Sequence, residues 1–226
     1  MIVLEGVPLE GVIFDMDGLM FDTETVYTLT WPPAAEEFGY HVTTEQVVGA
    51  IGLNAEAGRR YFEMLFGQGF PFYAIRERRL QMAAAYIQKN GLPVKKGLYH
   101  LVSYLTCHRV PIAVATSSER ERAEWYLKLS HLTDCFDAVI CGDEVKKSKP
   151  DPEIFLKAAY KLHANPKRCM ILEDSENGIR AANATGAIAV MVPDYKQPDR
   201  SLAKMTYKIL RDLDEVKLLI EVDNNG

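Results

Sequence analysis

Short apolar runs alternate with longer amphipathic segments along most of the chain. The runs are four to six residues long and rich in Val, Ile and Ala, which is typical of strands buried on both faces of a parallel sheet. They lie at residues 11–14, 112–115, 138–141, 169–172 and 187–192. Helical patterns lie between them, at residues 97–109, 120–130, 153–163 and 177–185. Strands that alternate with helices predict the α/β class, with an open, doubly wound parallel sheet of the Rossmann-like kind.

This alternation stops between residues 24 and 90, where the pattern indicates helices only. Helices are predicted at residues 43–51, 56–66 and 73–90. A helical block inserted after the first strand predicts a second, all-helical domain at residues 22–92 and a discontinuous α/β domain at residues 1–21 plus 93–226. The alternative is a helical elaboration without a function of its own. The Trp31-Pro32-Pro33 segment lies in this block before the first of these helices, and two prolines predict a break or a kink in any helix there.

Composition and charge narrow the classes of protein. Of 226 residues, 48% are apolar and the net charge is −5, so no basic excess is present to bind a nucleic acid backbone. No apolar run approaches the ~20 residues that a membrane helix needs, and Glu5 and Glu10 in a start without Lys or Arg do not suit a signal peptide. The four cysteines show no CxxC spacing, which favours buried, reduced thiols over disulfides or zinc. A cytoplasmic protein without nucleic acid or membrane partners is therefore expected.

Acidic residues follow the first predicted strand directly. Asp15 and Asp17 are separated by one residue and followed by Gly18. In an open α/β sheet, ligands bind beyond the carboxyl ends of the strands, and two carboxylates there can share one hard cation. Gly18 lets the chain turn sharply and brings backbone N–H groups close to an anion. The plain alternative is that Asp and Gly simply mark a turn.

Polar residues also follow the other strands. Thr116, Ser117 and Ser118 come after the second run; their hydroxyls could donate to a phosphate, although Ser118 is equally placed to cap the next helix. A second acidic pair, Glu173-Asp174, comes after the run at 169–172. A divalent cation would relieve the repulsion among such clustered acids.

A lysine-rich loop completes the set. Lys149 precedes Pro150, and Pro152 follows two residues later, which stiffens this loop. One rigidly held lysine can neutralise both the acids and a transferring phosphoryl group. Lys146 and Lys147 are expected to be solvated surface charges.

Together these segments resemble the haloacid dehalogenase (HAD) superfamily of phosphotransferases. The sequence is most similar to the branch that contains β-phosphoglucomutase and phosphoglycolate phosphatase. The matching segments are FDMDGLMFDTE (14–24), VATSS (114–118), KPDPEIF (149–155) and ILEDSENGIRAANATGA (171–187). The resemblance implies a Rossmann-like HAD core with an inserted helical cap, and a monomer, which is the default for this branch. It also implies a Mg²⁺-dependent phosphatase that acts on a small phosphorylated metabolite through an aspartyl-phosphate.

The resemblance also assigns roles. Asp15 matches the nucleophile and Asp17 the general acid/base. Thr116 matches the hydroxyl that binds the phosphoryl group, and Lys149 matches the catalytic lysine. Thr116, Lys149, the Ser117 backbone N–H and Glu24 are the implied substrate-binding groups.

The implied ligands of the metal ion are all oxygen atoms. They come from Asp15, Asp17 (through its backbone carbonyl) and Asp174, with Glu173 as a further ligand or as a partner of the ligands. Such a set favours Mg²⁺ over Zn²⁺.

One position separates phosphatases from mutases within this branch. β-Phosphoglucomutases carry a histidine where this chain has Tyr27, and a lysine in the loop that matches residues 49–56, which holds none here. A phosphatase is therefore predicted, and a β-phosphoglucomutase-type sugar-phosphate mutase is the alternative. A non-catalytic protein that binds a phosphorylated ligand is less favoured, because Asp15 and Asp17 are both present. Sugar phosphates, phosphoglycolate and nucleoside monophosphates all remain candidate substrates.

Overall fold

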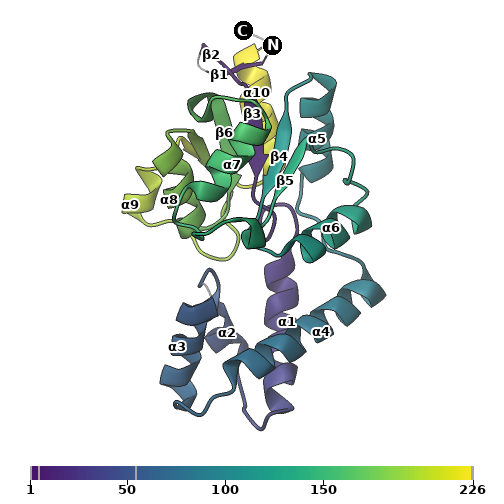
Figure 1. Ribbon diagram of the computed structural model, residues 1–226, viewed down its shortest axis with the longest axis vertical. Helices are drawn as coiled ribbons and strands as arrows, with labels where there is room; N and C mark the ends of the chain where they lie inside the picture. The colour runs from purple at the N-terminus through teal and green to yellow at the C-terminus, as the bar shows by residue number, and fades with distance from the viewer. Residues whose placement is uncertain (1, 5, 54, 225–226) are drawn as a thin grey trace. The chain divides into compact units, whose positions relative to one another are not determined.

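The computed structural model describes residues 2–4, 6–53 and 55–224. The chain divides into two compact units (Figure 1). The first combines Met1–Phe21 with Val94–Gly226, and the second is Asp22–Pro93.

A six-stranded sheet forms the centre of the first unit. The strand order is β5-β4-β3-β6-β7-β8 and every pairing is parallel, as in the doubly wound sheet that the sequence predicts. The strands are β3 (Gly11–Phe14), β4 (Ile112–Ala115), β5 (Ala138–Ile140), β6 (Cys169–Glu173), β7 (Ile188–Met191) and β8 (Lys208–Ile209). The chain runs outward from β3 through β4 to β5 and then crosses to β6 on the other side of β3. The carboxyl ends of β3 and β6 therefore flank the topological switch point, where this class of fold binds ligands.

Helices cover both faces of the sheet (Figure 1). They are α5 (Leu98–Cys107), α6 (Arg120–Leu129), α7 (Glu153–Lys161), α8 (Glu176–Thr185), α9 (Arg200–Ala203) and α10 (Leu213–Asn224), with the 3₁₀ turns η1 (Gly142–Glu144) and η2 (Pro166–Arg168). Ile13 and Ile171 of the sheet pack with Phe155 of α7 and Ile179 of α8 in one buried cluster. β3 and β4 are buried throughout, as expected for strands covered on both sides.

Several short elements were not predicted from the sequence. A two-stranded hairpin, β1 (Val3–Leu4) and β2 (Val7–Pro8), precedes the sheet. The side chain of Asn224 in α10 pairs with the backbone of Val3, accepting from its N–H and donating to its carbonyl, both at 2.9 Å. Strands of two residues are too short to show a period of alternation. β8, α9 and α10 were likewise not predicted.

The second unit contains α1 (Thr23–Glu36), α2 (Thr44–Ala50), α3 (Ala55–Phe66) and α4 (Phe72–Asn90). Of the two outcomes predicted for the prolines, a break or a kink, the break is wrong, because α1 runs through Pro32 and Pro33. Trp31 is buried and stacks on Phe62 with 4.5 Å between ring centroids. The packing of Trp31 on Phe62 stabilises α1 and offsets the loss of backbone donors at the two prolines.

No helix among the described residues is both long and apolar enough to cross a lipid bilayer. The cysteines are free thiols; Cys141 and Cys169 are buried, whereas Cys107 is exposed, contrary to the expectation for that residue.

Candidate active site

The predicted site residues of the first unit gather at the carboxyl ends of β4, β3 and β6. Asp15 follows β3, Thr116 follows β4, and Glu173 is the last residue of β6. The Asp15 backbone N–H donates to the Leu172 carbonyl at 3.0 Å, which continues the β3–β6 pairing by one residue. The sheet register thus places Asp15 between the other two strand ends.

Lys149 joins two of these carboxylates. Its Nζ donates to Asp15 Oδ1 at 2.5 Å, to Glu173 Oε1 at 2.6 Å and to the Ala115 carbonyl at 3.2 Å. All three charged side chains are buried, with exposed fractions of 8% for Lys149, 6% for Asp15 and 1% for Glu173. An ammonium group between two buried carboxylates offsets the cost of removing each from water.

Burial and charge shift the pKa values of this group in opposite ways. Burial raises the pKa of Asp15 to about 8, and Glu173 adds to the rise while Lys149 opposes it. Burial alone would lower the pKa of Lys149, but Asp15 and Glu173 outweigh burial and raise it. Lys149 is therefore positively charged, and it lies beside Asp15, a carboxyl group whose ionisation depends on the charges around it.

The start of α8 holds Glu173 in place. Glu173 Oε2 accepts hydrogen bonds from the backbone N–H and the hydroxyl of Ser175, both at 2.9 Å. Ser175 also caps α8, because its Oγ accepts from the Gly178 N–H at 3.1 Å. A Cβ at position 178 would lie 1.8 Å from Glu173 Cδ, so only glycine admits the carboxylate here. Neither Ser175 nor Gly178 is recognisable from the sequence as a residue of the site.

The carboxylates also meet the requirements of a hard cation. Asp15, Glu173 and Asp174 each offer an oxygen atom, and these atoms lie within 4.8 Å of one another. A Cβ at Gly18, where φ is +85°, would lie 2.2 Å from Asp174 Oδ2, so the glycine lets the loop after β3 approach Asp174. An all-oxygen donor set of this size fits a divalent cation such as Mg²⁺.

Asp17 lies at the other side of the loop, against the residues after β4. The Ser118 hydroxyl donates to Asp17 Oδ2 at 2.5 Å, and the Thr116 hydroxyl lies 3.4 Å from the same oxygen. Ser118 does not cap α6, the alternative considered from the sequence, because the N-cap position is Glu119. Arg122, which the sequence did not suggest, donates to the Ser118 hydroxyl through Nε at 3.0 Å and Nη2 at 2.5 Å.

Ser117 and Glu24, the other two predicted site residues, belong to different units of the chain. Ser117 is exposed, and its backbone carbonyl leaves no room for a Cβ at Gly142, at a separation of 2.3 Å. Glu24 belongs to the second unit, where it is half-buried in the first turn of α1.

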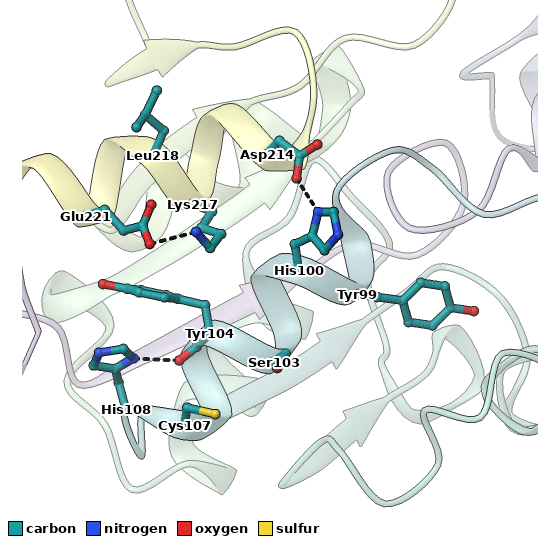
Figure 2. Close-up of a pocket in the computed structure, with 10 residues that line it drawn as sticks. All are labelled: Tyr99, His100, Ser103, Tyr104, Cys107, His108, Asp214, Lys217, Leu218 and Glu221. Carbon is teal, nitrogen blue, oxygen red and sulfur yellow. Dashed lines mark hydrogen bonds and ion pairs between the residues drawn. The ribbon is translucent and has the colours of Figure 1, made fainter.

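A groove of about 620 Å³ lies elsewhere on the first unit, between α5 and α10 (Figure 2). Its charged side chains pair with one another: His100 Nδ1 lies 2.8 Å from Asp214 Oδ1, and Lys217 donates to Glu221 at 2.6 Å. None of the predicted site residues lines it. The predicted catalytic residues therefore lie at the strand ends and not in this groove.

Comparison with known proteins decides the family. The family model of haloacid dehalogenase-like hydrolases matches residues 12–192, which include all the strand-end motifs. The chain belongs to this family. The resemblance found in the sequence is thereby confirmed, as is the prediction of an enzyme. Members of the family generally use a divalent metal ion.

Relatives of this haloacid dehalogenase-like hydrolase include both phosphatases and mutases. A probable pseudouridine-5'-phosphatase of Drosophila melanogaster is 33% identical over 213 residues, which cover 91% of this chain and 90% of the relative. A β-phosphoglucomutase of Bacillus subtilis is 29% identical over 193 residues, which cover 81% and 83%. A solved HAD hydrolase of Entamoeba histolytica has a TM-score of 0.80 at 20% identity, over 96% of this chain and all of that one. This last match confirms the fold.

Proposed function

We propose that this protein is a Mg²⁺-dependent phosphatase that hydrolyses a small phosphorylated metabolite through an aspartyl-phosphate on Asp15. The observation that carries the proposal is the placement of Asp15. Its carboxylate lies at the switch point of the sheet, bonded to a buried lysine and within reach of a second acidic side chain, Asp174. Phosphoryl transfer needs little else than in-line placement of a nucleophile and positive charge around the phosphoryl oxygens.

The first step forms one bond and breaks another. A carboxylate oxygen of Asp15 attacks the phosphorus atom, and the bond from phosphorus to the ester oxygen of the substrate breaks. Asp17 gives a proton to that oxygen, so the leaving group departs as an alcohol. In the second step a water molecule attacks the phosphorus of the aspartyl-phosphate, the bond from phosphorus to the Asp15 oxygen breaks, and the water gives a proton to Asp17. Inorganic phosphate leaves and both aspartates regain their starting states.

The neighbouring residues bind and orient the groups that react. Lys149 neutralises negative charge beside Asp15. The Thr116 hydroxyl and the Ser117 backbone N–H bind phosphoryl oxygens. Glu24, in the first turn of α1, is assigned to substrate binding on the resemblance alone.

The chain's own carboxylates would hold the metal ion. Asp15, Asp174 and the Asp17 backbone carbonyl are the proposed ligands. Both Glu173 oxygens already accept hydrogen bonds, from Lys149 and Ser175, so its role is to hold Lys149. When bound, Mg²⁺ supplies positive charge next to the phosphoryl group that is transferred.

The mutase alternative is supported by the Bacillus subtilis relative. Tyr27, however, occupies the position at which the resemblance to β-phosphoglucomutase implies a histidine. Burial raises the pKa of the Tyr27 phenol to about 12, and the Arg79 guanidinium lies 4.8 Å from its ring centroid. The phenol stays protonated at neutral pH and does not exchange a proton as an imidazole does. Hydrolysis is therefore favoured.

Phosphate release across a panel of phosphorylated metabolites, with Mg²⁺ and with EDTA, tests the proposal. Activity that requires Mg²⁺ and is lost in Asp15→Asn is expected. Asp134→Asn, which changes an exposed aspartate outside the site, is the matched control and should keep full activity. Conversion of β-glucose 1-phosphate to glucose 6-phosphate without phosphate release would instead establish the mutase.

A further inference from the structure

A chain of hydrogen bonds connects α6 to Asp17. Arg122 lies one turn after Ser118, and its Nε and Nη2 both donate to Ser118 Oγ, at 3.0 and 2.5 Å. Ser118 Oγ in turn donates to Asp17 Oδ2 at 2.5 Å. Ser118 is 1% exposed and Arg122 is half-buried. The resemblance to known families assigns no role to this arrangement.

The donors and acceptors fix the direction of this chain. A serine hydroxyl has one hydrogen to donate and two lone pairs to accept with. The two N–H groups of Arg122 occupy the lone pairs, so the single hydrogen of Ser118 must point to Asp17. A donor that itself accepts from a cation is polarised and forms a stronger hydrogen bond. Arg122 thus acts on Asp17 through Ser118.

A second contact of Asp17 Oδ2 is weaker. The Thr116 hydroxyl lies 3.4 Å from this oxygen, while Thr116 Oγ1 accepts from the Ser118 backbone N–H at 3.0 Å. Ser118 therefore makes the shorter side-chain bond to Asp17 and also fixes the hydroxyl that makes the longer one.

We propose that Ser118 and Arg122 are positioning residues that hold the Asp17 carboxyl group in the orientation for proton transfer to the leaving group. The inference rests on the proposed function, in which Asp17 is the proton donor. Their contribution is one of orientation: the bond to Oδ2 fixes rotation about the Asp17 side chain and directs its other oxygen, Oδ1, toward the ester oxygen of the substrate.

The leaving group provides a selective test. An alkyl phosphate such as 2-glycerol phosphate needs a proton on its departing oxygen, whereas p-nitrophenyl phosphate releases a stable phenolate without one. The ratio kcat/KM reports steps up to the first irreversible one, the transfer to Asp15, so later hydrolysis does not obscure the comparison. A misplaced Asp17 should slow the alkyl substrate selectively. A merely structural defect should slow both substrates alike.

We expect Ser118→Ala to lower kcat/KM for 2-glycerol phosphate by about 10- to 100-fold, and for p-nitrophenyl phosphate by less than about 3-fold. Arg122→Gln should show the same selectivity with a smaller loss, and Arg122→Lys should restore part of it. The double variant should match Ser118→Ala alone, because Arg122 acts through Ser118. Lys128→Gln removes a positive charge from the exposed end of the same helix and should change neither value.

Failure of the positioning role and failure of the proposed function give different results in these assays. If Asp17→Asn loses the alkyl substrate selectively but the Ser118 and Arg122 variants slow both substrates equally, the positioning role is overturned and the proposed function stands. A wild-type enzyme that releases no phosphate overturns both. Crystal structures of Ser118→Ala and the wild type give a readout without turnover: a changed or disordered Asp17 carboxyl group supports the inference, and an unchanged one overturns it.

Discussion

Replacing Gly178 by alanine should disturb the active site with a single methyl group. An alanine Cβ would lie 1.8 Å from Glu173 Cδ and 1.9 and 2.2 Å from its carboxylate oxygens. Carbon atoms normally approach to ~3.5 Å, so the Glu173 carboxylate would have to move by about 1.5 Å. The carboxylate is the flexible end of a side chain, but it is buried and cannot move without losing its hydrogen bonds to Ser175 and Lys149.

The expected loss of stability in Gly178→Ala follows from the hydrogen bonds that Glu173 would lose. The two hydrogen bonds from Ser175 are made to a charged group, and each such bond contributes about 1.5–3 kcal/mol. Alanine favours a helix interior over glycine by about 0.5–1 kcal/mol, which offsets part of the loss. With partial relaxation of the surroundings, we expect the free energy of unfolding to fall by about 3 kcal/mol. The midpoint of thermal unfolding should fall by roughly 6–12 °C, and kcat/KM should drop because Lys149 loses one of its two carboxylate partners.

Urea unfolding and thermal circular dichroism measure the stability, and phosphate release measures the activity. Gly69→Ala is the matched control, because position 69 has no heavy atom within 4 Å of a built Cβ and an ordinary φ; it should stay within about 0.5 kcal/mol of the wild type. A Gly178→Ala protein as stable and active as the control would refute the argument that glycine is needed for the approach of Glu173.

Three further outcomes follow from burial and charge. At pH 8, iodoacetamide should modify exposed Cys107 in the native protein but not Cys169, whose pKa burial raises to about 12; mass spectrometry that finds Cys169 labelled first would contradict this. Lys149→Met should lower activity by about 10²–10³-fold and leave two buried carboxylates unpaired. Its stability in EDTA should rise as the pH falls from 8 toward 5, because protonating a carboxyl whose pKa is raised relieves the charge; a flat profile by urea unfolding would count against it. Mg²⁺ should raise the unfolding temperature of the wild type and not of Asp174→Asn, and equal shifts in both would exclude Asp174 as a ligand.

The central strands could be predicted from the sequence because their signal is local. Residues 11–14 and 112–115 are apolar, and the strands have these same bounds. At β6 the apolar pattern predicted an end at residue 172, whereas the strand continues to Glu173. Glu173 is charged yet 1% exposed, since its charge is balanced by Lys149, 24 residues away in the chain. The pattern of polar and apolar residues along the chain cannot show that a charged residue has a partner so far away in the sequence.

The same reason explains the residues that sequence analysis missed. Ser118 contacts Asp17 across 101 residues of chain, and nothing local distinguishes that contact from helix capping. Ser175 and Gly178 occupy an ordinary cap and helix start, and their importance comes from Glu173 packing against them. For the proline pair in α1 the local pattern predicted an interruption of the helix that the structure does not have. A local rule for helix interruption was overridden by the packing of Trp31 on Phe62.

The insertion of the helical unit after β3 has a consequence for the order in which this chain is built during synthesis. Asp15 and its partner Lys149 are 134 residues apart, which corresponds to roughly 7–27 s at ribosomal rates of ~5–20 residues per second. During that interval β6 has not yet been made, and β4 (Ile112–Ala115), the other neighbour of β3 in the sheet, appears only in the last part of it, while residues Asp22–Pro93 emerge as one continuous segment with its own aromatic core. The nascent chain therefore carries an apolar strand without a sheet beside a segment that is already complete. We expect chaperones that bind extended apolar segments to engage residues 11–14 until β6 leaves the ribosome.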